Sequence, residues 1–399
     1  MALQEKLTKT AALTGNEAAA QAMRQIHPDV VAAYPITPQT EIVQLYSTFV
    51  NDGIVHTEYV AVESEHSALS ATIGAAAAGA RSMTATSSNG LAYMWEMLYI
   101  AAGLRLPIVM PVVNRALSGP INIHCDHSDT MGARDAGWIQ IYSENAQEMY
   151  DNLIQAVRIA ENPDIMLPVM VTMDGFIISH GMENVELLPD RAVEEFIGEY
   201  RYPYALLDIE NPRTIGPLTL QDFYFEHKRA QADAVVKAKT VILKVGEEYG
   251  QLTDRSYELI ESYRMEDAEY ALVVLGSTAG TAKYVIDELR QDGEKYGLVK
   301  IRVCRPFPAV RLGEVLSRVT AVGVMDRADS FSGEGGPIFA EVRAALYGVS
   351  HRPHCINYIY GLGGRDIGPD LIRSAALDIK SLKDGSESDS LVRYLGVRE

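Results

Sequence analysis

Two glutamates lie where an expected strand gives way to an expected helix. Glu63 and Glu65 follow the β-branched and aromatic residues of Tyr59–Val62, and small residues predict a helix from about Ser64 to Ala78. The helix dipole and free backbone N–H groups stabilise a carboxylate in a first helical turn. Ligands of open α/β sheets also bind at the carboxyl ends of strands. The pattern therefore indicates either a capped helix with an acidic first turn or carboxyl groups placed where such a sheet binds a ligand.

A hydroxyl and a guanidinium are expected near the same carboxyl groups. The two prolines of the segment Tyr34–Thr40 stiffen the loop after a buried strand and present the Thr37 hydroxyl at the strand end. Arg115 ends a strongly apolar strand, where a guanidinium is suited to a bidentate hold on a carboxylate. From the residues alone, this role and a structural pairing of Arg115 with Asp126 or Asp129 are equally open.

Three further groups have the composition of functional sites without the matching motifs. One polar loop contains four potential metal ligands, which are His124, Asp126, His127 and Asp129. No HExxH or CxxC frame accompanies them, so hydrogen-bonded loop residues are favoured over metal ligation. Asp174 and His180 suggest a hydrolase pair, but the sequence has no G-x-S-x-G nucleophile motif. Gly276–Gly280 lacks a complete dinucleotide or ATP pattern, so an ordinary strand-to-helix turn is expected there.

Length, charge and cysteine content narrow the class of protein. With 399 residues, the chain can form two or three domains, and its net charge of −18 argues against nucleic acid or an anionic membrane surface as partner. The sequence starts without an apolar signal segment and has no apolar stretch long enough to cross a bilayer, so a cytoplasmic location is expected. Its three cysteines, without a CxxC pair, suggest reduced thiols and cannot supply the four thiolates of an iron–sulfur cluster.

Strands alternate with helices up to about residue 174, which predicts a doubly wound, mainly parallel α/β domain. The expected strands after the first are Tyr59–Val62, Met83–Ala85, Pro107–Val113, Trp138–Tyr142 and Pro168–Met173. The expected helices include Glu41–Asn51, Leu91–Ala102 and Ala146–Glu161. Residues 189–217 look irregular, and residues 220–260 are expected to form a long charged helix with a break near Gly250–Thr253.

A second α/β unit is expected from Tyr270 onward. Its predicted strands are Ala271–Leu275, Leu298–Cys304, Ala321–Met325 and Ile356–Ile359. We therefore expect a first domain at 1–218, a helical bridge at 219–265, a second domain at 266–382 and a tail at 383–399, of which Lys383–Ser390 is polar and expected to be mobile.

Seven segments, in the same order along nearly the whole chain, resemble the α chains of the 2-oxoacid:ferredoxin oxidoreductase superfamily, in particular those that act on pyruvate. They are Tyr34–Thr40, Val62–Ala71, Thr84–Gly90, Asn114–Ile123, Arg134–Gln140, Arg305–Pro308 and Gly361–Asp366. Together these motifs are highly specific for the superfamily and less specific for the substrate.

The resemblance implies a thiamine diphosphate enzyme, in which this chain supplies the pyrimidine-side domain followed by a transketolase C-terminal-like domain. Glu65 matches the glutamate that bonds N1′ of the aminopyrimidine, while Thr37 and Arg115 match residues that face the 2-oxoacid. Four more residues are expected to bind the cofactor: Pro35, Ile36, Ser88 and Asn89.

The resemblance also implies the partners and the reaction. The Gly-Asp-Gly and Asn-Asn motif for the diphosphate and Mg²⁺ belongs to the β chain of the family and is absent here. Mg²⁺ and [4Fe–4S] clusters are therefore expected on partner chains only, and no metal on this chain. The expected complex adds β, γ and δ subunits and oxidatively decarboxylates pyruvate to acetyl-CoA and CO₂, with coenzyme A as acyl acceptor and ferredoxin as electron acceptor.

Other functions remain open at this point. The chain could act on a branched acid such as 2-oxoisovalerate, or belong to a cluster-free transketolase- or dehydrogenase-type thiamine enzyme. A non-catalytic scaffold is a third possibility, and the presence of Thr37, Glu65 and Arg115 together speaks against it.

Overall fold

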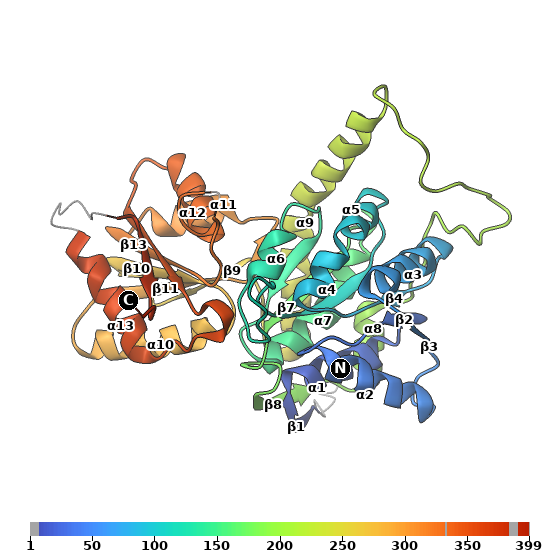
Figure 1. The fold of residues 1–399 in the computed structure, drawn as a ribbon, viewed down its shortest axis with the longest axis horizontal. Coiled ribbons are helices and arrows are strands. Elements are labelled where there is room, and N and C mark those ends of the chain that lie inside the picture. Colours follow the sequence, from blue (N-terminus) through green and yellow to red (C-terminus); the bar gives the residue numbers. More distant parts are fainter. Residues whose placement is uncertain (1–7, 332, 383–389, 399) are drawn as a thin grey trace.

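The computed structural model describes residues 8–331, 333–382 and 390–398, which form two α/β units (Figure 1). Most of the segment Lys383–Ser390, which we expected to be mobile, lies outside the described residues. Within the described ranges, no helix is both long and apolar enough to cross a membrane.

The first unit is built on a seven-stranded sheet of order β12-β6-β7-β5-β4-β2-β3. Its strands are β2 (Val30–Ala33), β3 (Glu58–Ala61), β4 (Ser82–Met83), β5 (Val109–Asn114), β6 (Ile139–Tyr142), β7 (Val169–Asp174) and β12 (Val303–Arg305). All neighbours pair in parallel except β12 and β6. Every residue of the central strands β5 and β7 is buried, as expected when helices cover both faces of a parallel sheet. The predicted doubly wound, mainly parallel domain is confirmed.

The helices of this unit follow the predicted alternation, with two differences. They are α1 (Gly15–Ile26), α2 (Thr40–Asn51), α3 (Glu65–Ala78), α4 (Ser88–Tyr93), α5 (Trp95–Gly103), α6 (Ser128–Gly132), α7 (Ala146–Ala160), α8 (Asp190–Ile197) and α9 (Tyr224–Thr253). The expected helix Leu91–Ala102 is two helices that meet at Met94. The expected irregular region contains α8, which packs on α1 and α7.

A small antiparallel sheet was not predicted. It pairs β1 (Lys9–Thr14) with β8 (Met182–Leu187), two strands far apart in the sequence. The residue at the end of β1, Thr14, also caps α1, because its hydroxyl accepts from the Glu17 backbone N–H while the Glu17 carboxylate accepts from the Thr14 N–H.

The second unit has a six-stranded sheet of order β15-β14-β13-β10-β11-β9. Its strands are β9 (Ile260–Tyr263), β10 (Tyr270–Val274), β11 (Tyr296–Ile301), β13 (Ala321–Asp326), β14 (His354–Tyr360) and β15 (Val392–Leu395). Helices α10 (Thr278–Gln291), α11 (Ala309–Leu316), α12 (Pro337–Tyr347) and α13 (Pro369–Ser381), with the short η1 (Leu362–Gly364), complete it. The edge strand β15 comes from the segment after residue 390 and pairs in parallel with β14.

The chain passes between the two sheets at Arg302. Our prediction of one strand over Leu298–Cys304 is wrong, because β11 belongs to the second sheet and β12 joins the edge of the first. The buried Arg302 guanidinium donates to the side chain of Asn152 on α7 across 2.7 and 2.9 Å. This contact fixes the crossing point, so the second unit is held directly against the first.

Candidate functional site

The structure brings the predicted residues to one edge of the first sheet. Strands β3, β2, β4 and β5 are consecutive neighbours and all parallel, so their carboxyl ends share that edge. The residues that follow these strands are Glu65, Thr37, Ser88 and Arg115. The order of the strands thus places an acid, a hydroxyl and a guanidinium, each from a different strand end, around one place.

Glu65 is the first residue of α3, and its side chain turns inward. Ser64, in an extended conformation, caps the helix by accepting the Ser67 backbone N–H at 3.2 Å. The buried Glu65 carboxylate makes no hydrogen bond or ion pair with any described residue. Glu63, in contrast, is exposed, and its pKa is lowered chiefly by the hydrogen bond that it accepts from the Ser67 hydroxyl. Of the two glutamates, only Glu65 is available to a ligand inside the protein.

Gly90 allows the Glu65 carboxylate its position. A Cβ atom at this residue would lie 2.9 Å from Oε1 of Glu65 and 2.5 Å from the hydroxyl oxygen of Thr86. Both distances are too short for any side chain, so only glycine fits between these two groups without a shift of the structure.

Three buried hydroxyls without partners belong to the segment between β4 and the start of α4. They are the hydroxyls of Thr84, Thr86 and Ser87, and none has a hydrogen-bond partner among the described residues. Such groups are uncommon in folded proteins, and a ligand or ordered water usually satisfies them. The Thr86 hydroxyl and the Glu65 carboxylate both lie beside Gly90, so together they offer a buried ligand one donor and several acceptors.

Arg115 binds backbone oxygens rather than carboxylates. The side chain is buried, and burial lowers the pKa of its guanidinium. Its Nε donates to the Asn122 carbonyl at 2.8 Å and its Nη1 to the Thr37 carbonyl at 2.9 Å, whereas Nη2 has no partner in the described chain. Asp129 does not contact the guanidinium; it accepts a hydrogen bond from the backbone N–H of Arg115 at 3.0 Å. The structural pairing with Asp126 or Asp129 is therefore not observed, and one edge of the guanidinium is free to hold an anion.

Thr37 is exposed, and its hydroxyl has no partner in the described part of the chain. The Thr37–Pro38 peptide bond is cis. The loop presents the Thr37 hydroxyl beside Arg115 because the carbonyl of the same residue is held by that guanidinium.

Asp129 is a site residue whose role the sequence did not predict. Its carboxylate accepts hydrogen bonds from the backbone N–H groups of Ser88, Arg115 and Thr130 and from the side chain of Asn114, at 2.7 to 3.0 Å. Burial raises its pKa to about 6. Ser88 has a φ of 47°, which is uncommon for a residue other than glycine. Asp129 therefore ties the start of α4 to the end of β5.

Of the four residues expected to bind the cofactor, Ser88 and Asn89 have hydrogen-bonded side chains, and the other two lie in a loop. The Ser88 hydroxyl donates to the Ala116 carbonyl at 2.6 Å, and the Asn89 side chain bonds Ser118 twice. Pro35 and Ile36 lie in the loop that leads to Thr37, and Pro35 is exposed. A role of any of the four in cofactor binding stays a prediction.

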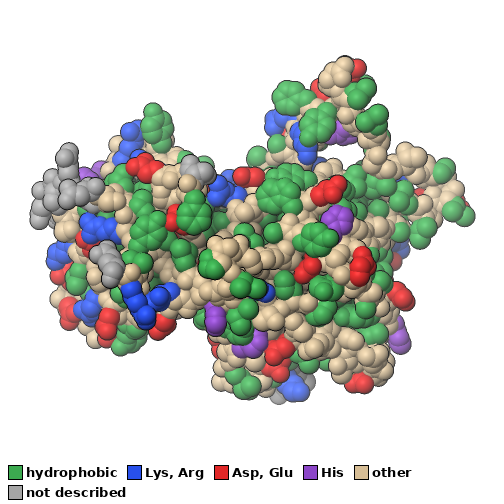
Figure 2. Space-filling view, viewed as in Figure 1, with side chains coloured by type: hydrophobic (Ala, Val, Ile, Leu, Met, Phe, Trp, Pro, Cys, Tyr) green, Lys and Arg blue, Asp and Glu red, His purple; other side chains and the backbone are tan. Residues whose placement is uncertain are grey.

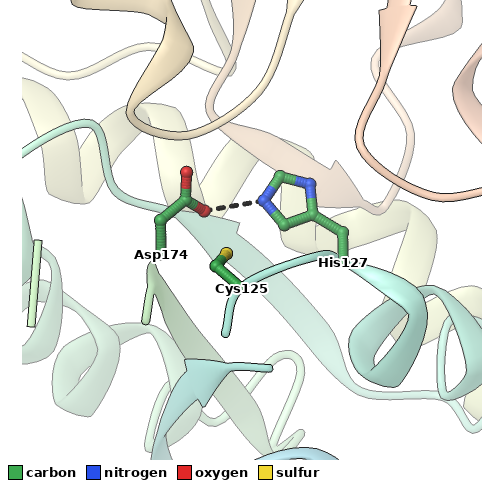
Figure 3. A group of neighbouring side chains, drawn as sticks. All are labelled: Cys125, His127 and Asp174. Carbon is green, nitrogen blue, oxygen red and sulfur yellow. Dashed lines mark hydrogen bonds and ion pairs between the residues drawn. The ribbon is translucent and has the colours of Figure 1, made fainter. Parts of the chain in front are cut away.

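A second buried cluster joins the two units (Figure 3). Asp174, at the end of β7, accepts from His127 at 2.7 Å and from Arg327 of the second unit at 2.9 Å. Burial by itself would raise the Asp174 pKa, but His127 and Arg327 outweigh it and hold that pKa well below its usual range. His180 is not its partner, because the His180 ring contacts Ser179 and Glu41.

This cluster also accounts for the glycine turn Gly276–Gly280. The Ser277 backbone N–H donates to Asp174 at 3.1 Å, so a carboxylate of the chain itself occupies the helix start where a phosphate would bind. Cys125 lies beside the pair, and burial raises its thiol pKa well above the usual range. A protonated thiol and a neighbouring arginine cation favour a structural contact between the units over metal ligation.

A cavity of about 540 Å³ lies elsewhere, between α1, α8 and the loop before β4. Two arginines that line it are paired, Arg24 with Asp190 and Arg81 with Glu161, each at 2.7 Å. None of the residues predicted to form the site lines this cavity.

Comparison with known protein families matches both units. The family described as "Pyruvate flavodoxin/ferredoxin oxidoreductase, thiamine diP-bdg" matches residues 21–247. The family described as "Pyruvate:ferredoxin oxidoreductase core domain II" matches residues 268–372.

Curated relatives match over nearly the full length. Pyruvate synthase subunit PorA of Thermotoga maritima is 57% identical over 99% of this chain and 100% of its own. The PorA subunit of Methanocaldococcus jannaschii is 47% identical over 96% and 98%. Ketoisovalerate oxidoreductase subunit VorA of Pyrococcus abyssi is 43% identical over 96% of each chain.

Solved structures share the fold. A 2-oxoglutarate:ferredoxin oxidoreductase from Magnetococcus marinus superimposes with a TM-score of 0.72 at 20% identity, over 92% of this chain and 65% of the other. A split-gene transketolase, described as an inactive β4 tetramer, gives a TM-score of 0.55 at 12% identity over 94% and 100%.

Proposed function

Since this chain belongs to the 2-oxoacid:ferredoxin oxidoreductase family, we propose that it is the α subunit of a pyruvate-oxidising complex and supplies the pyrimidine half of its thiamine diphosphate site. The complex decarboxylates pyruvate oxidatively to acetyl-CoA and CO₂ and reduces ferredoxin. The observation that carries this proposal is the buried carboxylate of Glu65 at the start of α3, which makes no hydrogen bond or ion pair with any described residue.

The lining around Gly90 fits the aminopyrimidine ring. When bound, thiamine diphosphate supplies the carbon nucleophile and stabilises the carbanion that decarboxylation requires. Glu65 holds N1′ of the ring from the start of α3 and exchanges a proton with it. The unpartnered hydroxyls of Thr86 and Ser87 provide further hydrogen bonds to the ring. Because Gly90 has no side chain, no Cβ atom fills the position beside the Glu65 carboxylate that the ring would occupy.

The substrate is held on the other side of the site. Arg115 binds the 2-oxoacid carboxylate through Nη2, because Nε and Nη1 already hold the side chain in place. The free Thr37 hydroxyl donates to the carboxylate or the keto oxygen. One guanidinium with a neutral hydroxyl suits a monocarboxylate such as pyruvate.

A branched 2-oxoacid is the second candidate substrate. The VorA relatives at 43% identity favour it, and the PorA relative at 57% favours pyruvate. Arg115 and Thr37 contact only groups that both acids share. Selection between the two acids would depend on the size of the substrate side chain. Each methylene changes the free energy of discrimination by only about 1–3 kcal/mol, so one enzyme can accept both acids.

The remaining parts of the machinery are assigned to partner chains. A β subunit provides the diphosphate and Mg²⁺ site, and [4Fe–4S] clusters on partner subunits, including γ and δ, carry electrons to ferredoxin. The three cysteines of this chain are free thiols, two of them buried, which is consistent with a cytoplasmic complex that leaves cluster binding to its partners.

The proposal is tested on the complete complex, co-expressed with its partner subunits. Coenzyme A-dependent reduction of a viologen dye is measured with pyruvate, 2-oxoisovalerate and 2-oxoglutarate. We expect the highest kcat/KM with pyruvate and no turnover after removal of thiamine diphosphate. A preference for 2-oxoisovalerate would reassign the substrate, and turnover without thiamine diphosphate would refute the site.

A further inference from the structure

One part of the first unit stands clear of its body. The loop of residues 199–223 and the first turns of α9 extend outward together (Figure 1). We refer to residues 199–233 as the arm. None of its residues is buried.

The buried stripe of α9 ends where the arm begins. The buried residues of this helix recur at intervals of mostly three or four positions: Ala234, Ala238, Ile242, Val245, Gly246, Tyr249 and Thr253. Residues Tyr224–Asp233 continue the helix for about 15 Å without a buried side chain. This part of α9 therefore exposes every one of its side chains at least partly to solvent.

The arm is rich in exposed apolar side chains. Ile209 and Leu218 are each 89% exposed, and Phe225 is 76% exposed. Other exposed apolar residues of the arm are Tyr204, Leu206, Leu207, Leu220, Phe223 and Tyr224. Figure 2 shows hydrophobic side chains over the arm and over the helices below it. Apolar surface of this extent marks a site of protein association.

The arm is attached to the far ends of the helices that form the candidate site. The Leu206 backbone N–H donates to the Ala77 carbonyl in the last turn of α3 at 2.9 Å. Ala205 packs against Gly79, which ends the same helix. Arg105, just after α5, donates to the Ala230 carbonyl at 3.4 Å. Glu65 and the arm therefore lie at opposite ends of α3, about 21 Å apart along the helix.

The surface between them has the composition of an interface. From Ser67 to Ala80 the chain has no charged side chain, although Gly74 is exposed and several neighbours are only partly buried. Beside α3, the aromatic residues Tyr93, Trp95 and Tyr99 are 59%, 45% and 37% exposed. Tyr93 contacts His66 of α3, with ring centroids 5.9 Å apart. We refer to this outer surface of α3, α4 and α5 as the α3–α5 face. A surface helix without a charged face is normally covered.

We propose that the exposed apolar side chains of the arm pack against the partner subunit that completes the thiamine diphosphate site. The same subunit covers the α3–α5 face from Glu65 to the arm. This inference rests on the proposed function, because only then must a second chain reach Glu65. Beyond His66 and Glu96, whose side chains lie 3.5 Å apart, a chain placed over the start of α3 meets a helix surface without charged side chains from Ser67 to the arm. A second copy of this chain lying there would close Glu65 off from the diphosphate-binding subunit.

Matched double variants test this contact between the arm and the partner subunit in the co-expressed complex. Leu207→Asp with Phe225→Asp places two charges on the arm, at residues that are 75% and 76% exposed. Val310→Asp with Tyr347→Asp is the control on the second unit, at residues that are 74% and 76% exposed. Mass photometry over a dilution series measures the dissociation of the β subunit, which completes the thiamine diphosphate site. Circular dichroism of each isolated variant chain reports whether it is folded. We expect the arm variant to dissociate at concentrations at least tenfold higher than the wild type, and the control at the wild-type concentration.

Three outcomes would overturn the inference. The arm variant could dissociate within twofold of the wild type, or the control could dissociate as readily as the arm variant. The arm variant could also lose only self-association of the isolated chain, which would assign the arm to a second copy. Glu65→Gln separates this question from the proposed function. That variant should assemble like the wild type, so retained turnover in Glu65→Gln would refute the proposed function and leave the binding result standing.

Discussion

The guanidinium of Arg115 donates through Nη1 to the backbone carbonyl of Thr37 across 2.9 Å. The two residues are 78 positions apart and follow different strands, β5 and β2. The contact holds the loop after β2 against the end of β5 and leaves Nη2 of Arg115 without a partner among the described residues. Binding of a carboxylate is therefore expected to depend on an arginine that is already fixed by the backbone.

Arg115→Ala should raise KM for every 2-oxoacid. A hydrogen bond to a charged group contributes about 1.5–3 kcal/mol, so kcat/KM is expected to fall about 10- to 100-fold for pyruvate and 2-oxoisovalerate alike. Steady-state kinetics of the assembled complex measure this. An effect on one acid only would show that Arg115 contacts the variable side chain of the substrate instead of the shared carboxylate.

Glu65→Gln should fold normally and lose most activity, because an amide cannot exchange a proton with N1′. A general acid–base group typically contributes about 10²- to 10⁴-fold to the rate. Viologen reduction by the assembled variant complex gives the measurement. Glu63→Gln is the matched control and should be mild, since Glu63 is exposed and its side chain bonds only Ser67 among the residues that the structure describes. Full turnover of Glu65→Gln, or an equal loss in both variants, would contradict the assignment.

Gly90→Ala should displace the Glu65 carboxylate, because the new methyl group would lie 2.9 Å from Oε1 and 2.5 Å from the Thr86 hydroxyl. We expect a large loss of kcat and weaker thiamine diphosphate binding, measured by activity titration with the cofactor. Gly348→Ala is the control, since no atom lies within 4 Å of the added Cβ and the backbone φ is −85°. Wild-type cofactor affinity in Gly90→Ala would place the ring elsewhere.

Asp129 should make the stability of the chain depend on pH. Burial raises its pKa from 3.8 to about 6, so the folded state favours the protonated carboxyl group more than the unfolded state does. This contribution is fully present below about pH 4 and is lost as the pH rises through about 6, with a size on the order of 3 kcal/mol. Urea unfolding of the isolated chain between pH 4 and 8 measures it.

Asp129→Asn is the companion experiment. The variant cannot titrate, so its difference in unfolding free energy from the wild type should change between pH 4 and 6 and stay constant above pH 7. It should also be less stable throughout, because the amide nitrogen cannot accept the hydrogen bonds that one carboxylate oxygen now receives. A difference that is constant across the whole pH range would contradict the raised pKa.

The isolated chain should bind thiamine diphosphate only weakly. In the proposed site, the residues around Gly90 would contact only the ring, because the diphosphate and Mg²⁺ site is proposed to lie on the β subunit. Calorimetric titration of the chain with thiamine diphosphate and Mg²⁺ should give little heat, and addition of the β subunit should restore tight binding. Tight binding to the isolated chain would show that it contains a complete site.

The amino-acid sequence by itself determined the local elements and the residues at their ends. The prolines beside Thr37, the small residues after Glu65 and the β-branched runs predicted the elements around the site, β2, α2, β3, α3 and β5, to within about two residues, because propensity and periodicity are properties of neighbouring residues. The parallel α/β pattern then required that Thr37, Glu65 and Arg115 share one edge of the sheet. The role of Glu65 itself came from the resemblance to a known family.

The tertiary structure decided which of the polar residues singled out in the sequence are in contact with one another. Asp174 pairs with His127 and Arg327, not with His180, and Asp129 holds the backbones of Ser88 and Arg115. The short strand β12 lies in a different sheet from β11, its immediate predecessor in the chain. Such contacts depend on the order and register of strands that are distant in the sequence. The free energy that selects them comes from packing the whole core, which no local pattern of residues contains.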